Sequence, residues 1–351
     1  MDTDTHLVPL FVASAHGGQS REAVALRRAA GRSSLVRVHR GVYVDAGSWR
    51  GFDARERHVV TVRAVMTGLA DTCVVSHGSA AAMLGLPSVD RGVDLVNVID
   101  PRRTTVKTTP YVRHRPGSLP TSDLTTLNGL PLTSPWRTAL DIARTAPFAD
   151  AVLCLDAVLR RVVLGDRHRS GPDVDVRLAA AKQDLVSAVG PPRSKGSRAA
   201  LRAVDFASPW AENGGESLAR VVMHELGAPA PRLQVEFTDA RGLAGRCDFW
   251  FEEIGGAFEL DGAQKYEKPT MLDGRSALEV VREQNRRQSR LLEVPGVRRV
   301  DRFDYLDLVR PRRLADKLQA AGMRLDPGCV AHAIAMSVLR FGHEHDLRTR
   351  R

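Results

Sequence analysis

Acidic side chains gather on two neighbouring apolar segments, residues 247–251 and 257–262. Asp248 lies in the first segment, and Glu259 and Asp261 lie in the second. The polar, glycine-containing stretch between the two segments predicts that they form a β-hairpin. Because side chains alternate along a strand, Glu259 and Asp261 are expected to share one face, which Asp248 would join from the neighbouring strand. Carboxylates this close repel one another unless a cation lies among them, so the pattern indicates a site for a hard divalent metal.

The order of the expected elements around these carboxylates resembles the PD-(D/E)XK nuclease superfamily, and within it the very-short-patch-repair-like endonucleases. The resemblance covers residues 212–308 and rests on a fixed order of helix, strand, acidic hairpin, helix and closing strand. These elements are expected at residues 216–226, 233–237, 247–262, 282–287 and 297–300. The resemblance implies a restriction-endonuclease-like domain with a central mixed sheet.

The same resemblance implies a metal-dependent activity and the residues that carry it. They are Glu216, Asp248 and Glu259 as ligands of Mg²⁺ or Mn²⁺, Asp261 as an assisting group, and Lys265 as the group that orients water or stabilises charge. A metal held in this way activates water for attack on a phosphodiester, so the implied reaction is cleavage of DNA. The chain departs from the family motif at Asp261, where the motif has Lys, and at Gln284, where relatives have a basic residue.

These charges also have explanations without catalysis. Acidic residues near strand ends are often only solvated, although three of them on such apolar strands are harder to explain without a partner. Three arginines share one face of the expected second helix and could contact DNA phosphates: Arg282, Arg286 and Arg290. Glu279 and Glu283 stand at salt-bridge spacing from them, so a solvated charged face is the alternative.

A second pattern, at the other end of the chain, predicts contact with DNA. Residues 9–15 are expected to form a short helix, Ser20 to cap a second helix over 21–30, and residues 35–44 to form a hairpin. This order is the plan of a winged helix-turn-helix, and it resembles the N-terminal domain of the AbiEi family of type IV antitoxins. The arginines expected to reach the grooves or the backbone are Arg21, Arg27, Arg28, Arg32, Arg37 and Arg40. The alternative is a small unit that only packs against the rest of the chain or mediates dimerisation.

The middle of the chain resembles the segments that follow the winged helix in the same antitoxin-like proteins. The resemblance therefore extends over residues 8–160, with a helical run at 54–69, short strands, and a helix at 136–144. His77 stands at an expected helix start and could serve as a base. A hydrogen-bonded structural role is the more ordinary explanation for a lone histidine.

The sequence thus indicates an α/β (α+β) protein with several parts. They are a winged helix-turn-helix at 1–50, a mixed α/β domain at 51–164, a basic linker at 165–208, a nuclease-like domain at 209–310, and a helix with a basic tail at 311–351. The net charge of +10 suggests a polyanionic partner, namely DNA. Residues 210–310 carry 15 basic and 18 acidic side chains, whereas residues 157–203 carry 10 and 4, so the positive surplus lies outside the acidic domain.

Several classes of function are disfavoured. The four cysteines show no CxxC spacing, which argues against a zinc site or a disulfide framework. With no signal peptide and no apolar run near twenty residues, a cytoplasmic protein without a membrane partner is expected. Two hypotheses remain: a Mg²⁺-dependent endodeoxyribonuclease recruited by the winged helix, and a non-catalytic transcriptional regulator or antitoxin of a type IV toxin–antitoxin system. DNA, a cognate toxin and a second copy of the chain are the expected partners.

Overall fold

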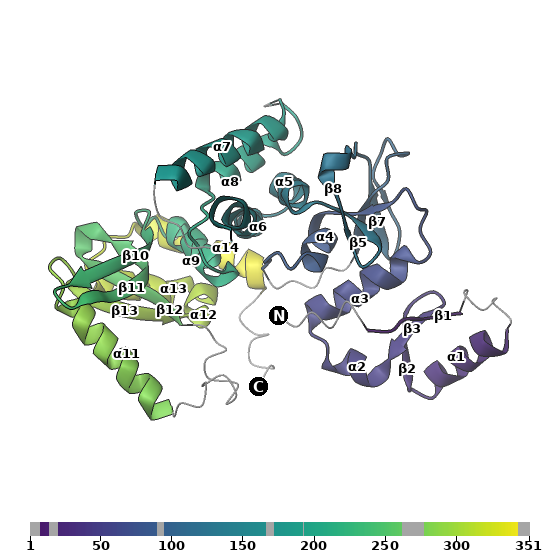
Figure 1. Ribbon diagram of the computed structural model, residues 1–351, viewed down its shortest axis with the longest axis horizontal. Coiled ribbons are helices and arrows are strands. Elements are labelled where there is room, and N and C mark those ends of the chain that lie inside the picture. The colour runs from purple at the N-terminus through teal and green to yellow at the C-terminus, as the bar shows by residue number, and fades with distance from the viewer. Residues whose placement is uncertain are drawn as a thin grey trace. The chain divides into compact units, whose positions relative to one another are not determined.

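The computed structural model describes residues 8–13, 20–89, 95–165, 172–191, 193–261 and 277–342, with the side chains of 277–284 left out. The chain divides into two compact units. One comprises residues 1–158 and 182–205, and the other comprises residues 159–181 and 206–351. Both units combine helices with sheets, which confirms the expected α+β class (Figure 1). No helix in the described ranges has both the length and the apolar composition that a bilayer crossing requires.

The first unit begins with a three-stranded sheet in the order β1-β3-β2. Its elements are β1 (Phe11–Val12), α1 (Arg21–Gly31), β2 (Leu35–His39), β3 (Val42–Asp45) and α2 (Ala46–Gly51). Ser20 caps α1, because its hydroxyl accepts a hydrogen bond from the Ala23 amide at 3.1 Å. The hairpin of β2 and β3 turns through Gly41 at φ +73°, a conformation that glycine adopts without strain. Both the capped helix and the hairpin agree with the sequence prediction.

One N-terminal prediction is wrong. Phe11 and Val12 do not form a helix with their neighbours but pair antiparallel with Tyr43 and Val42 of β3. The apolar run of residues 9–15 suits a helix or a strand equally, and the pairing partner decides the outcome. Residues 14–19 lie outside the described part, so the first helix of a helix-turn-helix is not among the elements seen here.

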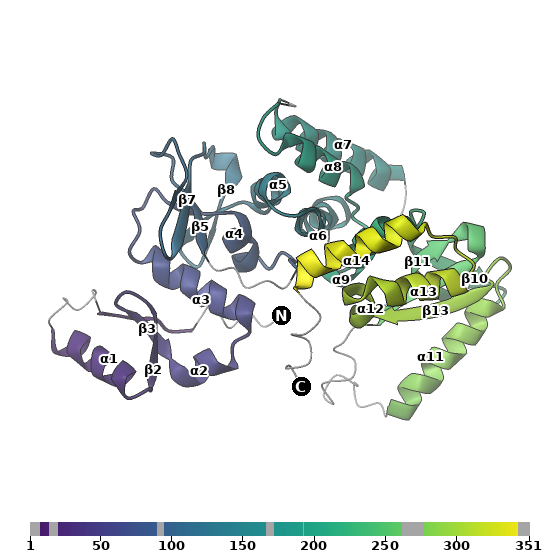
Figure 2. The same cartoon turned by 180° about the vertical axis from the view of Figure 1, so that it is seen from behind.

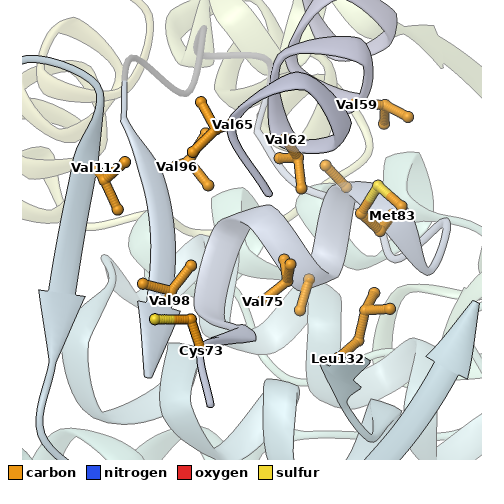
Figure 3. Packing of buried hydrophobic residues seen from close by; sticks show 12 residues of the cluster. Val59, Val62, Val65, Cys73, Val75, Met83, Val96, Val98, Val112 and Leu132 are labelled. Atoms are coloured by element: carbon orange, nitrogen blue, oxygen red, sulfur yellow. The ribbon is translucent and has the colours of Figure 1, made fainter. Parts of the chain in front are cut away.

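A six-stranded mixed sheet, ordered β6-β7-β5-β4-β9-β8, forms the rest of the first unit. Its strands are β4 (Val74–Val75), β5 (Val96–Ile99), β6 (Lys107–Thr108), β7 (Val112–Arg115), β8 (Leu124–Leu127) and β9 (Leu130–Thr133). The helices are α3 (Ala54–Met66), α4 (His77–Met83), α5 (Pro135–Thr145) and α6 (Phe148–Leu159). Valines of α3 pack on valines of β5 and β7 in one buried cluster (Figure 3). Burial of this β-branched face explains why such short strands form a stable sheet.

Three further helical segments lie where the two units meet in sequence. They are a π-helical turn (Arg160–Leu164), α7 (Pro172–Val189) and α8 (Ser197–Phe206). The segment at 165–208, which the sequence predicts to be a basic, partly helical linker, is therefore largely helical in its described residues. Gly196, just before α8, has φ +79° and passes within van der Waals distance of the Arg144 backbone, where no side chain fits.

The second unit is built on a four-stranded sheet, ordered β10-β11-β12-β13 (Figure 2). Its strands are β10 (Arg232–Asp239), β11 (Gly242–Phe251), β12 (Gly256–Asp261) and β13 (Arg299–Asp304). Its helices are α9 (Gly214–Glu225), α11 (Ala277–Leu292), α12 (Tyr305–Val309), α13 (Pro311–Ala320) and α14 (Pro327–Phe341). The first three strands are antiparallel, and β13 is parallel to β12. Helix, three strands, helix and closing strand follow one another in the order expected from the sequence.

Candidate functional sites

The first candidate site surrounds Glu216, which lies in the first turn of α9. Asn213 caps this helix and also donates from its amide to the Glu216 carboxylate at 2.6 Å. The backbone amide of Glu212 donates to the other carboxylate oxygen at 2.7 Å. The capping interactions therefore hold Glu216 in one orientation, with only 5% of its surface exposed.

Gln234 joins Glu216 to Asp248. The side-chain amide of Gln234, on β10, donates to Glu216 at 3.0 Å and to Asp248 at 3.3 Å. Gln234 has φ +52°, a left-handed conformation that is rare for a residue other than glycine. The other oxygen of Asp248 accepts from the backbone amide of Leu260 at 2.9 Å. Two carboxylates from α9 and β11 thus meet around one neutral amide.

Negative charge at this point is only partly compensated. Burial raises the pKa of Glu216 to about 7; the Glu212 backbone amide acts against this shift, whereas the negative charges of Asp248 and Glu212 add to it. A raised pKa shows that the folded protein penalises the ionised form of Glu216. A positive group placed between Glu216 and Asp248 would remove this penalty.

Glu259 has a different environment, made by arginines. Arg302, its register partner on the parallel strand β13, pairs with Glu259 at 3.1 Å and approaches Asp261 at 3.7 Å. Arg287 of α11 also pairs with Glu259. Glu259 and Asp261 therefore share one face, as alternation predicts, but arginines supply the positive charge there.

The three expected metal ligands are not preassembled as a tight cluster in the described part of the chain. In the described part of the chain, Glu216, Asp248 and Glu259 do not form a set whose ligand atoms all lie within 4.8 Å of one another. The alternation of β11 is interrupted near Asp248, because Cys247 and Trp250 pack into the same cluster although they are three positions apart and should face opposite sides. The pairing of β11 with β12 likewise ends at Phe249, one residue short of Asp248. Asp248 shares Gln234 with Glu216 of α9 and accepts from the Leu260 amide of β12.

The remaining predicted residues of this unit fall into three groups. Lys265 and the side chain of Arg282 lie outside the described residues. Arg286 is exposed on α11. Arg290 instead holds Asp239 at the end of β10 through two hydrogen bonds of 2.7 Å, so it has a structural role in fastening the helix to the sheet.

The second candidate site is the outer surface of α1 and the hairpin that follows it. The inner face of α1 packs Ala23, Leu26 and Ala30 onto Tyr43. The six arginines predicted for DNA contact are all exposed: Arg21, Arg27, Arg28, Arg32, Arg37 and Arg40.

The arginines of α1 are not spread evenly around the helix. At 100° per residue, Arg21, Arg28 and Arg32 project from the side opposite the packed residues, and Arg27 lies on the flank. We call Arg21, Arg28 and Arg32 the α1 basic face. Arg37 and Arg40 of the hairpin are exposed as well.

Sequence reasoning missed several residues of the acidic site. Gln234 sits on an expected strand, whereas Arg302 lies beyond the expected closing strand of 297–300, because β13 runs to Asp304. Only knowledge of their strand partners shows that they touch the carboxylates. It also missed a buried trio in the first unit, Cys73, Asp100 and His114, whose ligand-type atoms all lie within 4.8 Å of one another. Arg102 and Arg103 already pair with Asp100 at 3.0 and 3.4 Å, so the charge of this trio is compensated.

Comparison with known proteins supports part of the sequence reading. Residues 70–169, which span β4 to the π-helical turn, match the family model described as the AbiEi antitoxin C-terminal domain. Two uncharacterized proteins of Mycobacterium tuberculosis, MT2308 and Rv2248, are each 28% identical over 243 residues, which is 67% of this chain and 76% of theirs. No solved structure matches the chain.

Proposed function

We propose that this protein is a DNA-binding regulator of the antitoxin type. The observation that carries the proposal is the α1 basic face, which leaves Arg21, Arg28 and Arg32 exposed on one side of a capped helix while Tyr43 anchors the other side. Arginines on a helix and an adjacent hairpin suit contact with the DNA backbone and groove edges. The net charge of +10 favours such an encounter over long range.

The match of residues 70–169 to an antitoxin domain supports the second part of the proposal, a protein partner. We assign this segment to the binding of a cognate toxin, with DNA binding left to the preceding residues. A second copy of the chain would let two α1 basic faces read two half-sites, which is the usual arrangement for regulators of this kind.

The test measures binding of the full-length chain to the DNA upstream of its own gene, by fluorescence anisotropy. Arg28→Ala/Arg32→Ala removes two charges of the α1 basic face, and Arg312→Ala/Arg324→Ala removes two exposed charges from the second unit as a matched control. We expect the first variant to bind at least about tenfold more weakly and the control to bind within about threefold of the native protein. Equal losses in both variants would refute the assignment to α1.

A second candidate function, metal-dependent cleavage of DNA by the second unit, is favoured by the pair of Glu216 and Asp248. Two carboxylate oxygens on one amide, with a raised pKa at Glu216, are a donor set that a hard cation such as Mg²⁺ or Mn²⁺ accepts. Glu259 fits less well, because Arg302 and Arg287 already balance its charge.

In this candidate, Glu216 and Asp248 hold the ion, and Gln234 keeps the two carboxylates at a fixed spacing. The ion would supply Lewis-acid activation of water or phosphate. Arg302 would hold Glu259 beside the site and keep its negative charge from repelling the DNA phosphate.

Calorimetric titration with Mn²⁺ and a nicking assay on supercoiled DNA separate the candidates. The nuclease candidate expects uptake of Mn²⁺ that Asp248→Asn abolishes and Cys329→Ser preserves, together with nicking that depends on the metal. DNA binding without Mn²⁺ uptake would support the regulator hypothesis and exclude the nuclease hypothesis. Loss of uptake in both variants would show that the assay reports folding.

A further inference from the structure

A cavity of about 270 Å³ lies in the first unit, apart from both sites described above. Its walls come from α3, α4, α5, β5 and β7, and from the start of α6. Part of the lining is apolar, from residues such as Ala82, Ile142 and Pro147. The polar part includes Arg55, His58, His77, Asn97, Arg113 and Arg115, together with one acidic residue, Asp150, which accepts a hydrogen bond from the Val89 amide at 2.9 Å. The cavity thus offers an apolar wall opposite a strongly basic one.

Arg113 and Arg115 stand two residues apart on β7 and so project from the same face. Neither guanidinium forms an ion pair with a carboxylate in the part of the chain that the structure describes, and Arg115 donates only to the Asn97 side chain at 3.4 Å. Burial, followed by the charge of Arg113, lowers the pKa of Arg115. The charge of Asp141 partly offsets this effect on Arg115. Two neighbouring cations in a cavity, neither in a direct ion pair, are a costly arrangement that a bound anion would relieve.

His77 completes the basic wall and is held under strain. Its φ is +53°, and only 8% of its surface is exposed. The ring Nδ1 lies 3.0 Å from the Ser76 hydroxyl and 3.9 Å from Asp141 Oδ2. That oxygen of Asp141 is buried and accepts no hydrogen bond. The ring therefore faces the one oxygen of Asp141 that has no donor, while the other oxygen accepts from Arg137 at 3.0 Å.

We propose that this cavity binds the terminal phosphate of a small phosphorylated molecule, with Arg113 and Arg115 on the phosphate oxygens and His77 beside them. Two guanidinium groups match the charge of a phosphate monoester, which approaches −2 near neutral pH. A carboxylate or a phosphodiester carries one negative charge and would leave one arginine uncompensated. The charge count therefore selects a monoester.

The volume limits the rest of the ligand. Ligand cavities commonly measure about 300–1,000 Å³, so this one suits a mononucleotide or a smaller molecule. Its apolar wall would contact the uncharged part of that molecule. Binding would also place negative charge near His77, so the ring would accept a proton more readily and could then pair with Asp141.

The experiment titrates the full-length protein with adenosine monophosphate, inorganic phosphate, adenosine and a 5′-phosphorylated oligonucleotide, by calorimetry. We expect adenosine monophosphate to bind and adenosine not to bind. Arg113→Gln/Arg115→Gln should weaken binding at least about tenfold, whereas Arg28→Ala/Arg32→Ala on α1 should leave it unchanged. Arg113→Lys keeps the charge but loses the planar guanidinium group, so it should bind adenosine monophosphate with intermediate affinity. This variant tests the proposal if the double variant does not fold.

An independent readout follows the His77 ring by NMR during a pH titration. We expect saturating adenosine monophosphate to raise the pKa of His77 in the native protein and to leave it unchanged in Arg113→Gln/Arg115→Gln. Binding of inorganic phosphate alone would still support the phosphate subsite. Equal binding of adenosine and its monophosphate, or binding of the oligonucleotide but not of the mononucleotide, would overturn the proposal.

Discussion

Arg302 and Glu259 lie opposite each other on the parallel strands β13 and β12, and their side chains form an ion pair at 3.1 Å. The pair is mostly buried, with 24% and 10% of the two side chains exposed. It places a guanidinium on the face that also carries Asp261. This relationship explains how two acidic residues share one face of the sheet, because Arg302 offsets part of their mutual repulsion.

Replacement of Arg302 by Met is expected to destabilise the second unit, because Glu259 and Asp261 lose their shared partner. The free energy of unfolding should fall by about 1–3 kcal/mol, less than for a fully buried pair because Arg302 keeps some exposure. Glu259→Gln in the same background should recover part of the loss. Urea denaturation of the single and double variants measures the coupling. Strictly additive effects would show that the ion pair contributes nothing.

Gly255 should be intolerant of substitution. It ends the turn between β11 and β12 at φ +58°, and a Cβ there would lie 2.5 Å from the Gly296 carbonyl oxygen. Gly255→Ala therefore combines backbone strain with a clash and should cost about 2–4 kcal/mol. Gly322→Ala is the matched control, because Gly322 has φ +95° but open space around it and should cost about 1 kcal/mol. Similar losses of stability for Gly255→Ala and Gly322→Ala in thermal unfolding would rule out a steric clash at Gly255.

His77 should make stability depend on pH. Burial, then the charges of Arg115, Arg137 and Arg113, lowers its pKa from 6.5 to about 3, although Asp141 faces the same ring. The unfolded chain takes up a proton below pH 6.5 that the folded chain refuses until about pH 3. Stability is therefore lost as the pH falls through this window, by at most about 1.4 kcal/mol per pH unit.

The variant His77→Asn tests this sign, because asparagine tolerates positive φ but does not titrate. Between about pH 6 and pH 5, the native protein should lose roughly 1 kcal/mol more than the variant does. Urea unfolding at both pH values measures the difference. Parallel profiles for the two proteins would mean that the pKa of His77 is the same in the folded and unfolded chains.

Elements with a strong local signal could be predicted from the sequence. Ser20 predicts the start of α1. The apolar segments around Asp248 and Glu259 predict the hairpin of β11 and β12, and β13 follows α11 and pairs parallel to β12. The short strands of the middle sheet were harder to place. The hairpin of β8 and β9 turns through Asn128 and Gly129 at positive φ. It was not predicted from the sequence, because each of its strands is only four residues long.

The site could be predicted only in part, because its geometry depends on departures from regular strands. Alternation correctly places Glu259 and Asp261 together, but it does not predict that Asp248 shares Gln234 with Glu216. The sequence likewise gives no indication that Gln234 has a positive φ. Partners such as Arg302 come from a strand more than forty residues away and become visible only once the parallel pairing is known.

The salt dependence of DNA binding tests the central claim most directly. The logarithm of the association constant for upstream DNA is measured against the logarithm of salt concentration, for the native protein, for Arg28→Ala/Arg32→Ala and for Arg312→Ala/Arg324→Ala. If the α1 basic face contacts phosphates, the first variant loses about two units of slope, roughly one for each arginine, and the control loses almost none. An unchanged slope in the α1 variant would contradict DNA binding through this helix.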